Sequence, residues 1–191
     1  MEDKVALFDL DGTLASYEEQ MAHDLKLLQS PGEPTFHPFE DVPDWFENRM
    51  DLIKSKPGWW KTLPKHPLGM DILGESQRIG FHIQILTKGP KNTTNAWTEK
   101  LEWCYDELDI ANVTITSAKE PAHHKGLVYG RVLVDDYPDF VEAWLEWRKH
   151  GVVIMPANKL NENYEHPNVV RYDGSNIEEV RERLQWAFDR K

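Results

Sequence analysis

The stretch Val-Ala-Leu-Phe-Asp-Leu-Asp-Gly-Thr-Leu, residues 5–14, decides the fold. Its first four residues are apolar on both faces of an extended chain, which is typical of a strand buried in a parallel sheet. Asp9 and Asp11 follow at the end of this strand, separated by one residue. Gly12 then allows the backbone to turn sharply. The stretch therefore predicts a buried strand that delivers two carboxylates to one edge of a sheet.

Beyond residue 62, apolar runs typical of strands alternate with helical periodicity. Strands are expected at 81–86, 113–116, 131–134 and 152–155, and helices at 67–79, 92–108, 140–151 and 177–188. This alternation implies parallel βαβ units in an α/β fold, a three-layer Rossmann-like sandwich with a parallel sheet. In such sheets, ligands bind at the carboxyl ends of the strands.

The helix expected at 92–108 has the clearest amphipathic pattern. Its apolar face is predicted to contain Trp97, Leu101, Cys104, Tyr105 and Leu108. Cys104 is therefore expected in the core and not as a nucleophile.

Residues 16–62 interrupt the alternation. Apolar residues recur there at helical spacing in two groups, which are Met21, Leu25 and Leu28, and Phe46, Met50 and Ile53. Residues 30–38 lie between the groups and hold three prolines and a glycine, so a loop is expected. We therefore predict a small helical cap at 16–62, inserted after the first strand of a core domain that comprises 1–15 and 63–191.

Composition narrows the functional classes. The chain has 191 residues and a formal charge of 22 − 33 = −11, which argues against binding to a nucleic-acid polymer. No apolar run approaches the roughly 20 residues of a membrane span. A single cysteine and the lack of a basic, apolar leader favour a reducing, cytoplasmic location. The oligomeric state stays open, with a homodimer as one option.

The two aspartates at the strand end suit covalent phosphoryl chemistry. One carboxylate can attack phosphorus while the other manages the proton of the leaving group. Two close negative charges call for a divalent cation, and oxygen ligands suit Mg²⁺. The bare pattern Asp-x-Asp-Gly also occurs in calcium loops and in structural turns. The buried strand before it favours the catalytic interpretation.

The run from Phe8 to Leu14 resembles the first motif of the haloacid dehalogenase (HAD) superfamily, D-x-D-G-[TV]. The resemblance implies that Asp9 is the nucleophile, forming an aspartyl-phosphate, and that Asp11 is the acid/base residue. Dehalogenases of the superfamily lack the second aspartate, so Asp11 favours phosphoryl chemistry. Thr87 matches the second motif, a Ser or Thr after the second core strand that contacts the phosphoryl group.

The fourth motif of the superfamily matches Asp135-Asp136, which follow the strand expected at 131–134. The resemblance implies that Asp136 binds Mg²⁺ together with Asp9 and the backbone carbonyl of Asp11, while Asp135 lies in the layer behind. Asp139 is close by, but we expect it to cap the following helix.

The third motif of the superfamily is a lysine that neutralises the phosphoryl group. Lys125 is preferred because it precedes Asp135 by ten residues, and Lys119 is the alternative. The neighbouring pair His123-His124 is expected in a solvated loop and not at a zinc site, because no further ligand has suitable spacing.

The Lys125 spacing and the turn Pro57-Gly58-Trp59-Trp60 resemble the 5′(3′)-deoxyribonucleotidase branch of the superfamily. This resemblance implies a phosphomonoesterase of nucleoside monophosphates. Trp60 is expected only to pack the cap. The residues expected to contact substrate are Tyr17, Trp45, Phe46, Trp59, Thr87, Lys88 and Lys125.

One departure leaves the substrate open. Lys-Gly-Pro follows Thr87, where the branch has Ser-Pro. The alternatives are a phosphatase of a sugar phosphate or another small metabolite, a phosphomutase, and a non-catalytic phosphate-binding or partner-binding module.

Overall fold

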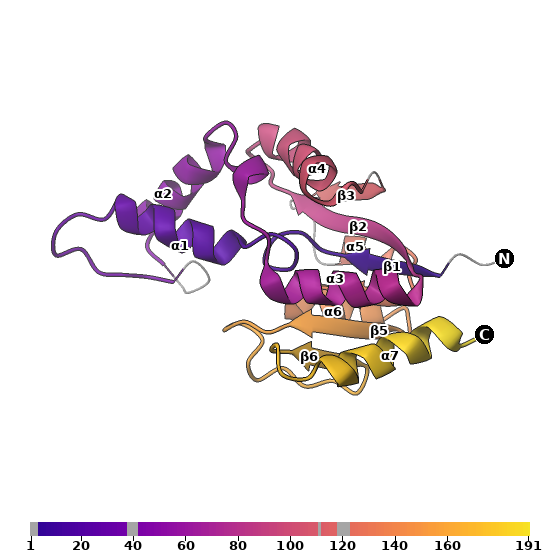
Figure 1. Cartoon of the computed structure of the whole chain (residues 1–191). Coiled ribbons are helices and arrows are strands. Elements are labelled where there is room, and N and C mark those ends of the chain that lie inside the picture. The colour runs from indigo at the N-terminus through magenta and orange to yellow at the C-terminus, as the bar shows by residue number, and fades with distance from the viewer. Residues whose placement is uncertain (1–3, 38–41, 111, 118–122) are drawn as a thin grey trace.

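The computed structural model describes residues 4–37, 42–110, 112–117 and 123–191. Its centre is a parallel sheet of six strands in the order β3-β2-β1-β4-β5-β6 (Figure 1). The strands are β1 (Val5–Phe8), β2 (His82–Gly89), β3 (Val113–Ser117), β4 (Val132–Val134), β5 (Val152–Pro156) and β6 (Val169–Tyr172). The α/β fold with a parallel sheet is confirmed.

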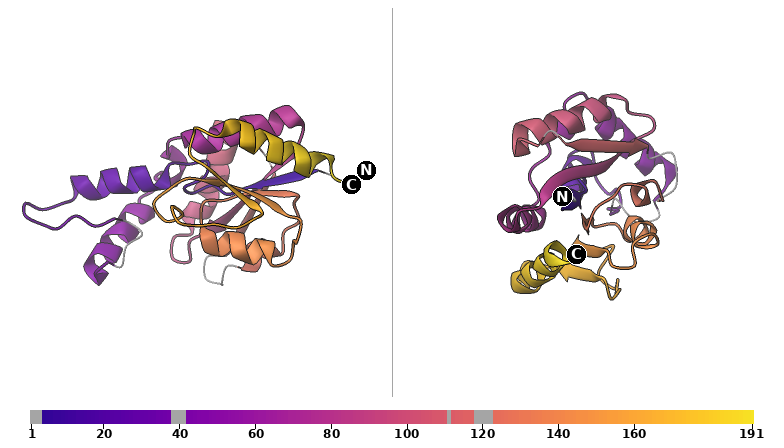
Figure 2. Two further views of the ribbon diagram at one scale, coloured as in Figure 1. Left: turned by 90° about the horizontal axis from the view of Figure 1, so that it is seen from below. Right: turned by 90° about the vertical axis from the view of Figure 1, so that its right-hand side faces the viewer.

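Helices cover both faces of the sheet, as the two views of Figure 2 show. One face packs against α3 (Pro67–Ile79), α4 (Asn95–Leu108) and α7 (Ile177–Asp189). The other packs against α6 (Pro138–Leu145), with the short α5 (His123–Gly126) beside it. Residues of β1 alternate between the two cores, because successive side chains of a strand point to opposite faces. This gives the three layers of the sandwich.

Two helices, α1 (Tyr17–Leu27) and α2 (Asp44–Ser55), project beyond the carboxyl ends of the strands (Figure 1). The chain returns to the sheet through a 3₁₀ turn, η1 (Trp60–Thr62), which leads to α3. This arrangement agrees with a helical segment at 16–62, while its standing as a separate cap domain stays a prediction. Within the described residues, no helix is long and apolar enough to cross a membrane.

Several predicted elements differ from those in the structure. Strand β6 was not predicted, because Arg171 interrupts its apolar run. His123 and His124 belong to the backbone of α5 and not to a loop. Helix α6 begins at Pro138, so Asp139 lies inside its first turn and is not its cap.

The buried face of α4 is not the predicted one. Its buried residues are Ala96, Glu99, Lys100, Trp103 and Cys104. Cys104 is in the core as expected, but Tyr105 is 47% exposed. The apolar pattern predicted the wrong face because α4 buries two charged side chains, Glu99 and Lys100, which other parts of the fold pair with polar partners.

Candidate active site

The site begins in the turn after β1. The Asp9 amide donates to the Val134 carbonyl over 2.8 Å, which holds the strand end against β4. The amides of Thr13, Leu14 and Ala15 all donate to the Leu10 carbonyl, which closes the turn. Both carboxylates therefore leave a tightly bonded segment at the carboxyl edge of the central strand.

Two glycines allow neighbouring elements to approach this turn closely. Gly12 has a φ of +78°, and a Cβ there would lie 2.5 Å from Oδ2 of Asp136. Gly69 in α3 lies so near the turn that a Cβ would lie 1.7 Å from the Thr13 carbonyl oxygen. A side chain at either position would displace the turn or the acidic group beside it.

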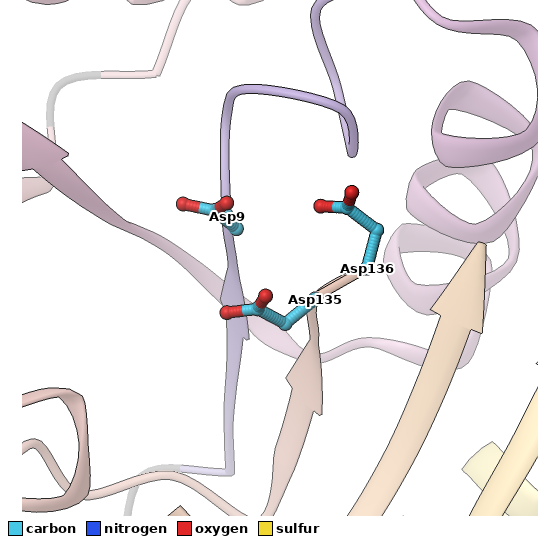
Figure 3. A group of neighbouring side chains, drawn as sticks. All are labelled: Asp9, Asp135 and Asp136. Carbon is cyan, nitrogen blue, oxygen red and sulfur yellow. The ribbon is translucent and has the colours of Figure 1, made fainter. Parts of the chain in front are cut away.

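Three buried aspartates form a candidate metal site (Figure 3). Asp9 leaves the end of β1, and Asp135 and Asp136 leave the end of β4; one oxygen of each lies within 4.8 Å of the other two. Burial raises the pKa of Asp136 well above its usual value, and the charges of Asp135 and Asp9 raise it further. Buried, clustered carboxylate oxygens are the donor set that Mg²⁺ prefers, so this site fits a divalent cation.

Lys125 connects two of these aspartates. Its fully buried ammonium lies 2.8 Å from Asp9 Oδ1 and 2.7 Å from Asp135 Oδ2. Burial by itself lowers the pKa of Lys125, but the charges of Asp135 and Asp9 outweigh burial and raise it overall. The lysine therefore stays charged. Lys119, the alternative, lies outside the described residues.

Asp135 is also held by the backbone. Its Oδ1 accepts the Tyr137 amide over 3.1 Å, so each of its carboxylate oxygens has a protein donor. Burial raises the pKa of Asp135 to about 6, which Lys125 opposes. Its predicted place behind the metal ligands stays a prediction.

Asp136 is positioned by residues that were not predicted. Its Oδ1 accepts the Thr13 hydroxyl over 3.0 Å, and its Oδ2 accepts the Asn158 amide over 2.8 Å. Asn161, fully buried, donates to the Asp136 carbonyl over 2.9 Å and accepts from Arg171 over 2.9 Å. These asparagines lie in a loop after β5, and loop asparagines carry no signal that separates them from ordinary turn formers.

A second buried lysine that was not predicted, Lys100 of α4, contacts Asp11. Its ammonium donates to Asp11 Oδ2, to the Lys88 carbonyl over 2.6 Å and to Thr87 Oγ1 over 3.4 Å. Burial raises the pKa of Asp11, although Lys100 opposes this shift. In the sequence, Lys100 shares a helical stripe with Ala96, Trp103 and Cys104, and a lysine within an apolar stripe is the signal that could have identified it.

A cavity of about 320 Å³ opens over these groups. It is lined by Asp9, Asp11, Tyr17, Lys54, Trp60, Lys88, Pro90, Lys100, Asp136, Tyr137 and Phe140. The structure thus brings together most of the residues predicted for catalysis and for metal binding. Thr87 and Lys125 reach the same group through their contacts with Lys100 and Asp9.

Only some of the aromatic residues at 16–62 that were predicted to contact substrate line the cavity. Tyr17 lines the cavity, and so does Trp60, which was expected only to pack the cap. Trp45, Phe46 and Trp59 are absent from the lining. Phe46 is buried between the cap helices, Trp45 packs on its ring, and the Trp59 indole donates to Asp24 over 2.7 Å. Phe46 and Trp59 belong to the buried core around α1 and α2, whereas Trp45 is 42% exposed.

Comparisons with known proteins place the fold. No family model matches the chain, and no curated protein matches its sequence. Among solved structures, a haloacid dehalogenase-like family hydrolase from Xanthomonas campestris aligns with a TM-score of 0.57 at 13% identity, covering 98% of this chain and 99% of that one. A HAD hydrolase of family IA, variant 3, from Entamoeba histolytica aligns with a TM-score of 0.55 at 14% identity, covering 95% and 99%.

Identities this low carry information about the fold and not about substrate. The alignments nevertheless span nearly the whole of each chain, the α1–α2 segment included. The protein therefore has the α/β fold of haloacid dehalogenase-like hydrolases.

Proposed function

We propose that this protein is a Mg²⁺-dependent phosphomonoesterase that works through an aspartyl-phosphate on Asp9. One observation carries the proposal: Asp9, held by buried Lys125, meets Asp11 and Asp136 at a single cavity at the carboxyl edge of the sheet. A nucleophile, a proton carrier and a candidate metal site in one cavity are the parts that phosphoryl transfer requires.

In the first step, a carboxylate oxygen of Asp9 attacks phosphorus and the bond from phosphorus to the ester oxygen breaks. Asp11 gives its proton to that oxygen, so the alcohol leaves neutral. Lys125 orients Asp9, since its ammonium lies 2.8 Å from Oδ1. Thr87, whose oxygen accepts from Lys100, has its own hydroxyl proton available for a phosphoryl oxygen.

In the second step, water attacks the phosphorus of the aspartyl-phosphate. Asp11 takes a proton from this water, and the bond from phosphorus to Asp9 breaks. Inorganic phosphate leaves, and both aspartates return to their starting states. One carboxyl group thus serves as acid and then as base, which requires that it stay in place through the cycle.

Asp9 and Asp136 would hold Mg²⁺, with the backbone carbonyl of Asp11 as a further oxygen ligand and Asp135 behind. When bound, the ion neutralises charge on the phosphoryl oxygens. The crowding of buried negative charge supports this assignment, because the same charge raises the pKa of Asp136.

For the substrate, we propose a nucleoside monophosphate. Tyr17, Trp60, Tyr137 and Phe140 line the cavity, and aromatic faces suit a base or a sugar ring. The α1–α2 segment, as a cap over residues 16–62, would select among esters, because the catalytic groups contact only the phosphate. The buried single Cys104 supports a reducing, cytoplasmic setting as part of the same proposal.

The test is a panel of esters assayed with Mg²⁺ and with EDTA. Nucleoside 5′- and 3′-monophosphates are compared with sugar phosphates, and Asp9→Asn is compared with Asp106→Asn, a change at an exposed aspartate of α4. We expect Mg²⁺-dependent release of phosphate that Asp9→Asn abolishes and Asp106→Asn retains. A preference for sugar phosphates would replace the nucleotide assignment, and full activity of Asp9→Asn would refute the nucleophile.

A further inference from the structure

The ammonium of Lys100 is saturated by protein acceptors. The side chain is 1% exposed and donates to Asp11 Oδ2, to the Lys88 carbonyl and to Thr87 Oγ1. A lysine ammonium has three N–H donors, and these three acceptors use all of them. Lys100 therefore has no donor left for substrate, although it lines the cavity.

The contact with Lys100 gives the two carboxylate oxygens of Asp11 different hydrogen bonding. Lys100 holds Oδ2, whereas Oδ1 is buried and has no hydrogen-bond partner within the described part of the chain. A proton on Oδ1 therefore breaks no existing bond of the protein. The contact with Lys100 restrains rotation of the carboxyl group.

Helix α4 links this contact to the cap. Glu99, adjacent to Lys100, accepts the amides of Gly58 over 2.8 Å and Trp60 over 3.2 Å. The Trp60 ring in turn lies 4.6 Å from the Lys100 ammonium, a cation–π contact. Two adjacent buried charges thus fasten the cap turn and the catalytic turn to the same helix.

We propose that Lys100 is a positioning residue that holds Asp11 in register with the ester oxygen. The inference rests on the proposed function, because it assigns a role within that reaction. A general acid acts only within hydrogen-bond reach of the atom it protonates, and it contributes about 10²- to 10⁴-fold to the rate. If the carboxyl group rotates freely, part of this rate enhancement is lost.

The experiment compares two esters whose leaving groups differ in their need for a proton. p-Nitrophenyl phosphate has an acidic leaving group that departs without protonation, whereas an alkyl phosphate such as a nucleoside 5′-monophosphate requires the proton of Asp11. For Lys100→Met we expect the ratio of kcat/KM, alkyl over aryl, to fall about 10- to 100-fold, part of the general-acid factor. The ratio does not depend on the fraction of folded enzyme, so a structural loss alone leaves it unchanged.

Four further variants make the outcome decisive. Asp11→Asn should lower the same ratio at least as much, and adding Lys100→Met to it should lower the ratio little further, because residues that act through one another are not additive. Lys100→Gln, which keeps a donor, should give a smaller fall and serves if Lys100→Met does not fold. Lys61→Met removes an exposed lysine that pairs with Glu102 on the outer side of α4, and should leave the ratio unchanged.

Failure of the positioning role and failure of the proposed function give different results. An unchanged ratio in both Lys100 variants, with an active wild type, would overturn the positioning role and leave the phosphatase standing. A wild type that hydrolyses neither ester would overturn the proposed function itself.

Discussion

Replacing Lys125 by Met is the sharpest test of the charge arrangement, because it removes a cation and keeps the shape. The lysine is fully buried between Asp9 and Asp135, at 2.8 and 2.7 Å. At an effective dielectric constant of about 20, each contact corresponds to a gross attraction of about 6 kcal/mol, most of which offsets the cost of burying the charges. Removing one partner of such a group typically costs about 3–5 kcal/mol, because the remaining charges stay buried and uncompensated.

A loss of about 3–5 kcal/mol corresponds to a fall in Tm of about 6–20 °C for a domain of this size. The assay is urea unfolding and thermal unfolding at pH 7 in EDTA, with Lys61→Met as the exposed control. The double variant Lys125→Met/Asp135→Asn also removes one stranded carboxylate, so it should recover a substantial part of the loss. A Lys125→Met protein within about 1 kcal/mol of wild type, the value of an exposed ion pair, would refute a buried and charged lysine at this position.

Three other predictions concern the turn, the metal and the C-terminal helix. Gly12→Ala should destabilise the protein by about 1–3 kcal/mol, the usual cost of a left-handed backbone for a residue with a Cβ. It should also weaken Mn²⁺ binding, because the added Cβ displaces Asp136. Unchanged thermal unfolding and unchanged metal affinity would contradict this prediction. Asn158→Ala removes a donor to Asp136, so calorimetry should show about 10- to 100-fold weaker Mg²⁺ or Mn²⁺ binding. Hydrogen bonds from Arg181 and then Arg78 lower the pKa of Glu75 to about 2. The ionised Glu75 therefore stabilises the fold fully above the normal glutamate pKa, and this stabilisation is lost as the pH falls toward 2. Between pH 5 and 2, Tm should fall less in Glu75→Gln than in wild type, and parallel curves of Tm against pH would exclude the linkage.

The cap aromatics mark where sequence reasoning reached its limit. Trp45, Phe46 and Trp59 carry the same chemical signal as Tyr17 and Trp60, but only the latter two line the cavity. Which ring lines the cavity depends on how α1 and α2 pack on each other, and that packing is a long-range property. An aromatic residue in a small helical pair serves equally well as core or as a pocket wall, and its sequence neighbours do not distinguish the two.

The sequence by itself determined the framework of this protein. A short run that is apolar on both faces and ends in a turn favours a buried strand, and the helices around it follow from periodicity, which is a local property. Because carboxyl ends of parallel strands share one edge, local signals at Asp9, Thr87 and Asp135 were enough to predict one site. Their catalytic roles stay predictions until they are assayed.

Only the tertiary structure decided how that site is held together. Lys100 lies 89 residues from Asp11, and Asn158 lies 22 residues from Asp136. A buried charge is tolerated only where a partner compensates it, and the partner is brought by the fold and not by sequence spacing. The apolar stripe around Lys100 can indicate that this lysine is buried, but its contact with Asp11, like that of Asn158 with Asp136, forms only when α4 and the loop after β5 meet the end of the central strands.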